Sequence, residues 1–163
     1  MTTAVLPLGT PGLSHGTSDR AVGREARDLR EMLRTAVDRH SSVVLGRRHW
    51  NLQDVRREAA TQNWDGYGAR AVDDATYARA EAFLDGLSIA APDPDVAADP
   101  DGELSFTWYR EPRRMFSVSI SRDGRLSYAG LLGPSTVHGT EYLDDAIPEA
   151  IEANLARLFP AGT

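Results

Sequence analysis

One stretch of this chain brings together the residue types of a nucleophilic site. Ser135, His138 and Asp144 fall within ten residues of one another and could supply a nucleophile, a base and an orienting acid. The sequence around them lacks the G-x-S-x-G turn that exposes a serine nucleophile. Because Ser, His and Asp also meet by chance in polar loops, we predict no catalytic residue here.

Residue types that bind metals or phosphates are present but poorly spaced. The four histidines form no pair with ligand spacing: His15, His40, His49 and His138. Four aspartates alternate as in a calcium loop but lack its Gly and Glu: Asp93, Asp95, Asp99 and Asp101. Gly130 and Gly133 follow a predicted strand without a Walker lysine. We therefore predict no metal site and no cofactor.

Two clusters combine arginine with large aromatic side chains, the residue types that dominate binding hot spots. One is the run Arg47-Arg48-His49-Trp50, and the other is the loop from Asn63 to Arg70, Asn-Trp-Asp-Gly-Tyr-Gly-Ala-Arg. The first could also be a solvated loop whose Trp50 packs on the next helix, and the second a rigid glycine turn. The predicted partner-binding residues are Arg47, Arg48, Trp50, Trp64, Tyr67 and Arg70.

The composition limits the classes of function. The 163 residues carry a net charge of −6, contain no Cys, and use Arg for all 18 basic residues. Residues 1–62 hold ten Arg and seven acids, whereas residues 63–163 hold eight Arg and seventeen acids. General nucleic-acid binders need a basic footprint that this chain lacks. Disulfides and thiolate chemistry are excluded, and without a secretory signal or membrane span we predict a cytoplasmic protein.

Helical periodicity appears in four places. We predict a disordered tail at residues 1–17, an amphipathic helix at residues 18–40, and a second helix that begins at Asn51 and ends near Gln62. Residues 18–62 would form a helical N-terminal extension, and residues 63–163 an α+β domain. Asp73 caps a third helix that ends near Gly86, and Pro148 begins the last one.

The period changes to two after Glu103. Leu104, Phe106 and Trp108 share one face of a predicted strand, and two further alternating runs follow, the second after the Asp123-Gly124 turn. The segment around Val96 could be an extended segment or an edge strand, and residues 133–140 could be a loop or a short fourth strand. We therefore predict an α+β fold, a three- to four-stranded antiparallel meander with helices packed on its apolar face.

Residues 63–130 resemble a family of small uncharacterised bacterial proteins. The resemblance rests on the loop Trp64-Asp-Gly-Tyr-Gly-Ala69, the following helix, and the strand from Asp101-Gly-Glu103 to Trp108. No activity is established for that family, so the resemblance assigns no functional residue. Its members are often accessory genes, which implies an interaction or regulatory role.

The main hypothesis is a non-enzymatic protein-interaction module, such as an inhibitor, immunity or regulatory accessory factor. The helix at residues 18–40 would also allow a homo-oligomer. One alternative is an enzyme with a loop-built site around Asp65, Tyr67 and His138. Another is a weak nucleic-acid binder that uses the basic N-terminal segment.

Overall fold

The structure is a computed structural model that describes residues 31–36 and 46–160. It divides into two units, residues 1–39 and residues 40–163, which are described separately. In the first unit, residues 31–36 form a helix with Met32 and Leu33 exposed. The predicted tail and most of the predicted helix at residues 18–40 lie outside the described residues.

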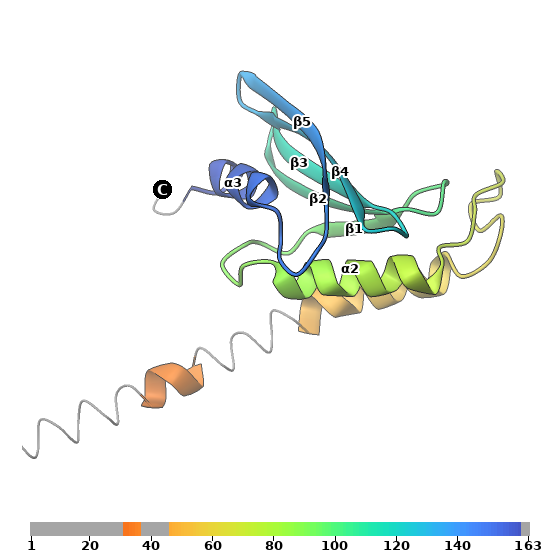
Figure 1. Ribbon diagram of the computed structural model, residues 1–163, viewed down its shortest axis with the longest axis horizontal. Helices are drawn as coiled ribbons and strands as arrows, with labels where there is room; N and C mark the ends of the chain where they lie inside the picture. The colour runs from red at the N-terminus through yellow and green to blue at the C-terminus, as the bar shows by residue number, and fades with distance from the viewer. Residues whose placement is uncertain (1–30, 37–45, 161–163) are drawn as a thin grey trace, which may run out of the picture. The chain divides into compact units, whose positions relative to one another are not determined.

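The second unit is built on a five-stranded antiparallel sheet with the strand order β1-β2-β3-β4-β5. The strands are β1 (Asp95–Ala98), β2 (Leu104–Glu111), β3 (Arg114–Ile120), β4 (Arg125–Leu132) and β5 (Ser135–Tyr142). Each strand pairs with the next along the chain, so the sheet is a simple meander (Figure 1). The predicted α+β antiparallel meander is confirmed, but with five strands rather than three or four, since the segment around Val96 and the one within residues 133–140 both form strands.

The sheet packs against α2 (Asp74–Gly86), α3 (Glu149–Leu158) and a helix at residues 46–58 (Figure 1). As predicted, Asp73 caps α2, with its carboxylate accepting from the N–H of Thr76. The inward-facing residues of α2, α3 and the strands form one hydrophobic cluster. Because side chains alternate along a strand, the helices bury one face of the sheet and leave the other to solvent.

The helix at residues 46–58 differs from the sequence prediction. It already includes Gly46, so Asn51 lies inside it rather than at its N-cap, and Trp50 is exposed. Leu52 and Ala59 are buried in the same cluster as the sheet. This segment, which the sequence groups with the N-terminal extension, therefore packs as part of the sheet unit.

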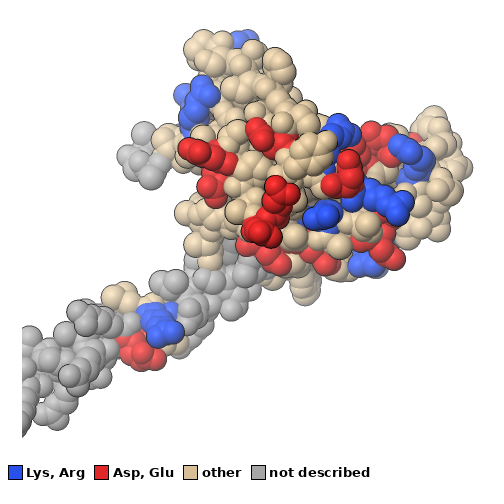
Figure 2. All heavy atoms as spheres, in the orientation of Figure 1, with Lys and Arg blue, Asp and Glu red and all other residues tan. Residues whose placement is uncertain are grey.

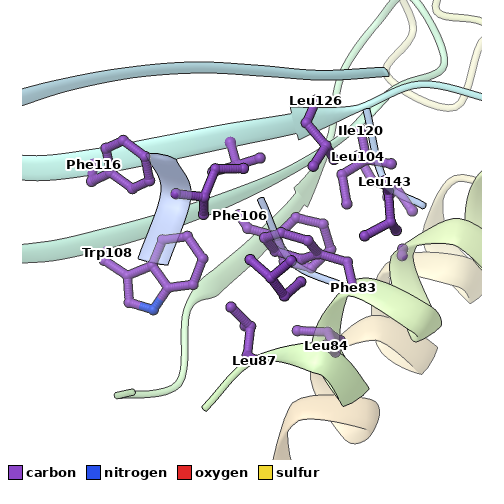
Figure 3. Packing of buried hydrophobic residues seen from close by; sticks show 14 of the residues in the cluster. Phe83, Leu84, Leu87, Leu104, Phe106, Trp108, Phe116, Ile120, Leu126 and Leu143 are labelled. Atoms are coloured by element: carbon purple, nitrogen blue, oxygen red, sulfur yellow. The ribbon is translucent and has the colours of Figure 1, made fainter. Parts of the chain in front are cut away.

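The centre of the core is a chain of aromatic side chains that links α2 to the sheet (Figure 3). The ring of Phe83 lies 5.2 Å from that of Phe106 and 6.5 Å from that of Trp108. Trp108 lies 6.3 Å from Phe116, which is 5.8 Å from Tyr128. All these separations are typical of stabilising aromatic pairs.

Two glycines on the core face of the sheet make room for these rings. A Cβ at Gly130 would lie 2.8 Å from Cδ2 of Phe116 and 2.9 Å from the carbonyl oxygen of Met115. Gly139 is covered in the same way by the ring of Tyr128. Large residues on β3 and β4 thus occupy space left by small residues on the next strand.

Replacing Gly130 with Ala should therefore destabilise the fold. Since the Met115 carbonyl belongs to the backbone, it cannot move aside cheaply, and we expect a loss of about 1–3 kcal/mol in the free energy of unfolding. Urea denaturation measures it. Gly46→Ala is the control, because no atom lies within 4 Å of that Cβ; an equal loss in both variants would contradict the packing argument.

Candidate interaction surfaces

The glycine-rich loop at residues 63–69 is held closed by its own polar groups. The N–H of Asn63 donates to the Ala69 carbonyl at 2.7 Å. The Asp65 carboxylate accepts from the N–H groups of Tyr67 and Ala69, and the Asn63 amide oxygen accepts from Gly68. Gly68 has φ = 98°, a conformation that favours glycine. The loop is therefore preformed rather than shaped by a partner.

The two aromatic residues of this loop have different environments. Trp64 is half-buried against the core, and its Nε1–H donates to the Arg70 carbonyl at 3.1 Å. Tyr67 is 95% exposed. The N–H of Arg70 donates to the Pro100 carbonyl, which ties the loop to the β1–β2 turn. Trp64 thus anchors the loop, and Tyr67 and the exposed Arg70 face solvent.

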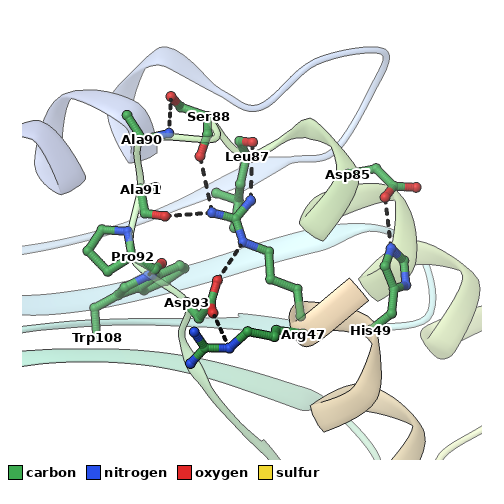
Figure 4. Close-up of polar contacts among 11 residues, drawn as sticks. Arg47, His49, Asp85, Leu87, Ser88, Ala90, Ala91, Pro92, Asp93 and Trp108 are labelled. Carbon is green, nitrogen blue, oxygen red and sulfur yellow. Dashed lines mark hydrogen bonds and ion pairs between the residues drawn. The ribbon is translucent and has the colours of Figure 1, made fainter. Parts of the chain in front are cut away.

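The cluster at residues 47–50 likewise contains both buried and exposed side chains. Arg48 is fully buried, and its guanidinium donates to the carboxylate of Asp93 and to three carbonyl groups of the segment between α2 and β1 (Figure 4). Those carbonyls belong to Leu87, Ser88 and Ala91, at 3.4, 3.2 and 2.6 Å. Arg48 therefore holds two segments of the chain together and presents no surface to a partner.

The neighbours of Arg48 remain accessible. Arg47 is 76% exposed and lies 3.5 Å from the Asp93 carboxylate. Trp50 is 78% exposed. These residues lie near the N-terminal end of the described helix at residues 46–58, whereas Tyr67 and Arg70 follow its other end, which is about 12 Å or more away along the helix axis at 1.5 Å per residue. The structure thus separates the predicted binding residues into two places.

A third surface, not predicted from the sequence, is the open face of the sheet. No described helix covers it. Tyr109, Met115 and Leu131 lie directly opposite one another on β2, β3 and β4, and Thr136 continues the row on β5. Tyr109 is 60% and Met115 36% exposed. We call these four residues the apolar row.

The apolar row lies between a charged turn and uncharged polar residues of the open face. In the view of Figure 2 the upper part of the molecule, where the ends of the long strands lie, shows few charged atoms. The β2–β3 turn at the same end of the sheet carries Arg113 and an ion pair between Glu111 and Arg114 at 3.0 Å. Next to the row the open face carries Ser and Thr, with the Thr107 and Ser117 hydroxyls hydrogen-bonded at 3.0 Å. The side chains are fixed on strands rather than on loops, which favours a specific contact.

The opposite end of the open face carries acidic residues, and burial disfavours their ionised forms. Burial raises the pKa of the Asp99 carboxyl, and the neighbouring Asp101 carboxylate raises it further. Hydrogen bonds from the Ser105 and Ser119 hydroxyls offset part of this effect. Burial likewise raises the pKa of Glu103, while Arg125, which donates to it at 2.6 Å, lowers it.

Asp99→Asn should stabilise the protein at neutral pH. Because the folded-state pKa of Asp99 is raised, the native protein loses stability as pH rises from the ordinary carboxyl value through the folded value. Asn removes this penalty. We expect a higher Tm than wild type at about pH 7 and no advantage at about pH 3, where the carboxyl is protonated in both states.

Asp65→Asn provides a control of opposite sign. Backbone hydrogen bonds from Tyr67 and Ala69 lower the pKa of Asp65, so its ionised form contributes stability that is lost as pH falls. Asp65→Asn should therefore lower Tm at neutral pH and have no effect in acid. Thermal unfolding followed by circular dichroism across this range measures both variants, and parallel pH profiles for the two would contradict the assignment.

The residues proposed for an enzymatic site do not share a cavity. One cavity of about 580 Å³ is lined by Arg70, Arg122 and several carboxylates, including Asp101 and Asp123. Neither it nor the two smaller cavities, of about 430 and 150 Å³, are lined by Asp65, Tyr67 or His138. His138 lies on the edge strand β5, at the far side of the sheet from β1, to whose turn the loop is tied.

Within the described ranges, no group of three or more His, Asp or Glu residues could hold a metal ion. None of the helices in the same ranges is long and apolar enough to cross a membrane. Comparison with known protein families, with curated proteins and with solved structures finds no match to this chain.

Proposed function

We propose that this chain is a protein-interaction module that binds its partner through the open face of the sheet. The observation that carries the proposal is the apolar row, in which Tyr109, Met115 and Leu131 lie side by side on three strands. Tyr and Met are enriched in the cores of protein interfaces, and a row fixed on strands loses little conformational entropy on binding.

The charge pattern supports a protein partner over a nucleic acid. The Ser and Thr side chains beside the row can donate and accept hydrogen bonds, as an interface rim does. The acidic end around Asp99 and Glu103 would repel phosphate groups and attract a basic protein surface. Together with the resemblance to bacterial accessory proteins, this favours an inhibitor, immunity or regulatory factor.

Quantitative affinity purification tests the proposal. Full-length wild type, the double variant Tyr109→Ala/Met115→Ala and Tyr67→Ala are each used as bait in a lysate of the native host. We expect a partner retained by wild type and by Tyr67→Ala, and lost from the double variant although its circular dichroism is unchanged. Loss from Tyr67→Ala alone would move the binding site to the loop at residues 63–69. Equal capture by all three would reject both surfaces.

A further inference from the structure

The two edges of the sheet are protected to different extents. β1 has four residues, lies between Pro94 and Pro100, and borders a cavity shared with Trp64 and the helix at residues 46–58. β5 has eight residues, and no Pro, Lys or Arg interrupts it. Natural proteins usually blunt a sheet edge with such residues or cover it, because an open edge templates pairing with another strand. β5 has no Pro, Lys or Arg, and its one charged residue, Glu141, stands on the core-facing side opposite Leu126.

The phase of the β4–β5 ladder shows which backbone groups of β5 face outward. The N–H of Leu143 donates to the Gly124 carbonyl at 2.8 Å, which continues the ladder beyond the strand. Bonded pairs alternate in an antiparallel ladder, and the register pairs Gly139 with Tyr128. The odd-numbered residues of β5 therefore bond to β4. The N–H and C=O groups of the even-numbered residues point away from the sheet: Thr136, His138, Thr140 and Tyr142.

We propose that β5 pairs antiparallel with β5 of a second copy of this chain, about a two-fold axis at Gly139. In this register Thr136 lies opposite Tyr142 of the second copy, and His138 opposite Thr140. All four outward-facing residues then find partners, giving about eight backbone hydrogen bonds at two per bonded pair. Gly139 meets Gly139, and no like charges face each other directly, as cross-strand pairing requires.

Antiparallel pairing brings opposite charges together at the two ends of β5. Parallel pairing would place like charges together instead. At the β4–β5 turn, the N–H of Gly133 donates to the carbonyl of Arg113, which places that arginine, in the β2–β3 turn, at the same end of the sheet as the beginning of β5. Asp144 and Asp145 follow the end of the strand. An antiparallel pair brings the arginine end of each copy to the acidic end of the other, twice by symmetry.

The net charge of the unit opposes this contact. Residues 46–160 contain 12 Arg and 19 acidic residues, a net charge of 12 − 19 = −7. Two such units repel at long range, and physiological salt screens this repulsion beyond about 8 Å while leaving closer contacts. The affinity of the pairing therefore depends on the strand edge and on its end charges. A single substitution at either place should change the dimer Kd.

Pairing about this axis has a consequence for binding. The axis is perpendicular to the sheet, so both open faces lie on the same side of one continuous sheet, and the dimer presents two apolar rows. A bivalent surface of this kind raises avidity without new contacts. The dimer does not depend on the partner proposed above, and the two proposals fail separately.

Light scattering coupled to size-exclusion chromatography of the full-length chain tests the dimer over about 1–200 µM, a range in which mass action shifts the equilibrium. Wild type and Thr140→Ala should dimerise, since Ala keeps the outward N–H. Thr140→Pro removes that N–H without breaking a β4–β5 bond, and Pro is tolerated on the outer side of an edge strand. We expect at least about a tenfold increase in its dimer Kd.

A charge exchange gives a second readout that does not depend on Pro being tolerated. Arg113→Glu and Asp145→Arg should each weaken the dimer, and the double variant should restore it. A monomeric wild type at the highest concentration would overturn the proposal, as would a dimer that survives Thr140→Pro with unchanged Kd. If Thr140→Pro does not fold, the charge exchange decides: restoration supports the pairing, and additive weakening refutes it.

Discussion

Arg48→Met should cost about 3–5 kcal/mol in the free energy of unfolding, roughly a third of the stability of an ordinary domain. The guanidinium of Arg48 is fully buried and donates to the Asp93 carboxylate and to three carbonyls of the segment between α2 and β1. Met fills a similar volume but leaves all four acceptors without this donor. Buried acceptors left unpaired carry most of the cost.

Three further variants separate charge from geometry. Arg48→Lys keeps the charge but not the planar fork, so it should recover only part of the loss. Asp93→Asn combined with Arg48→Met removes the carboxylate that has lost its Arg48 partner and should recover another part of the stability. Arg47→Met is the matched control, since Arg47 is 76% exposed and should change stability by less than about 0.5 kcal/mol. Urea denaturation measures each variant, and a similar loss at positions 47 and 48 would contradict the structural role of Arg48.

The burial of Arg48 explains where sequence reasoning stopped. Arg48 precedes Leu52 by four residues and Val55 by seven, so it extends the apolar stripe of its helix. That spacing was a signal for burial. The acceptors that compensate the burial of this arginine come from residues 87–93, about forty positions later. No local sequence pattern predicts that these residues lie beside Arg48. An arginine beside a tryptophan therefore looked like a binding cluster.

The strands show the same limit. β2, β3 and the first half of β4 alternate apolar and polar residues, so the period of two was enough to predict them. β5 alternates Val137, Gly139 and Glu141 with polar residues. The core-facing space at Gly139 is filled by the ring of Tyr128 from β4. The large side chain that would have indicated a buried strand position therefore belongs to β4 and not to β5. The helix α2 was predictable, because Asp73 caps it and Val72 and Tyr77 flank the cap, and both are buried.

The candidate surface was only half visible in the sequence. Alternation predicts that Tyr109 lies on the face opposite Trp108, among Ser and Thr residues. It does not give the register between strands, which is what aligns Tyr109, Met115 and Leu131 into one row. Register depends on turn geometry and on packing of the buried face, and both are properties of the folded chain.

Trp108→Leu should cost about 3–5 kcal/mol, the second large effect. Trp108 is 2% exposed and contacts both α2 and β3 through Phe83 and Phe116. Its Nε1–H also donates to the Pro92 carbonyl at 2.8 Å. Trp108→Phe keeps much of the ring packing and loses the hydrogen bond, so it should cost about 1–2 kcal/mol. Urea denaturation measures both, and equal losses would show that the ring itself contributes little.

The same residue tests whether the segment between α2 and β1 folds as a unit. Arg48 holds that segment from the helix at residues 46–58, through the Ala91 carbonyl, and Trp108 holds it from β2, through the adjacent Pro92 carbonyl (Figure 4). Once one tie is removed the segment can loosen, and the other tie then stabilises less. The double variant Arg48→Met/Trp108→Leu should therefore lose less than the sum of the single losses, by about 0.5–3 kcal/mol. Strict additivity would mean that the two ties act on independent parts of the fold.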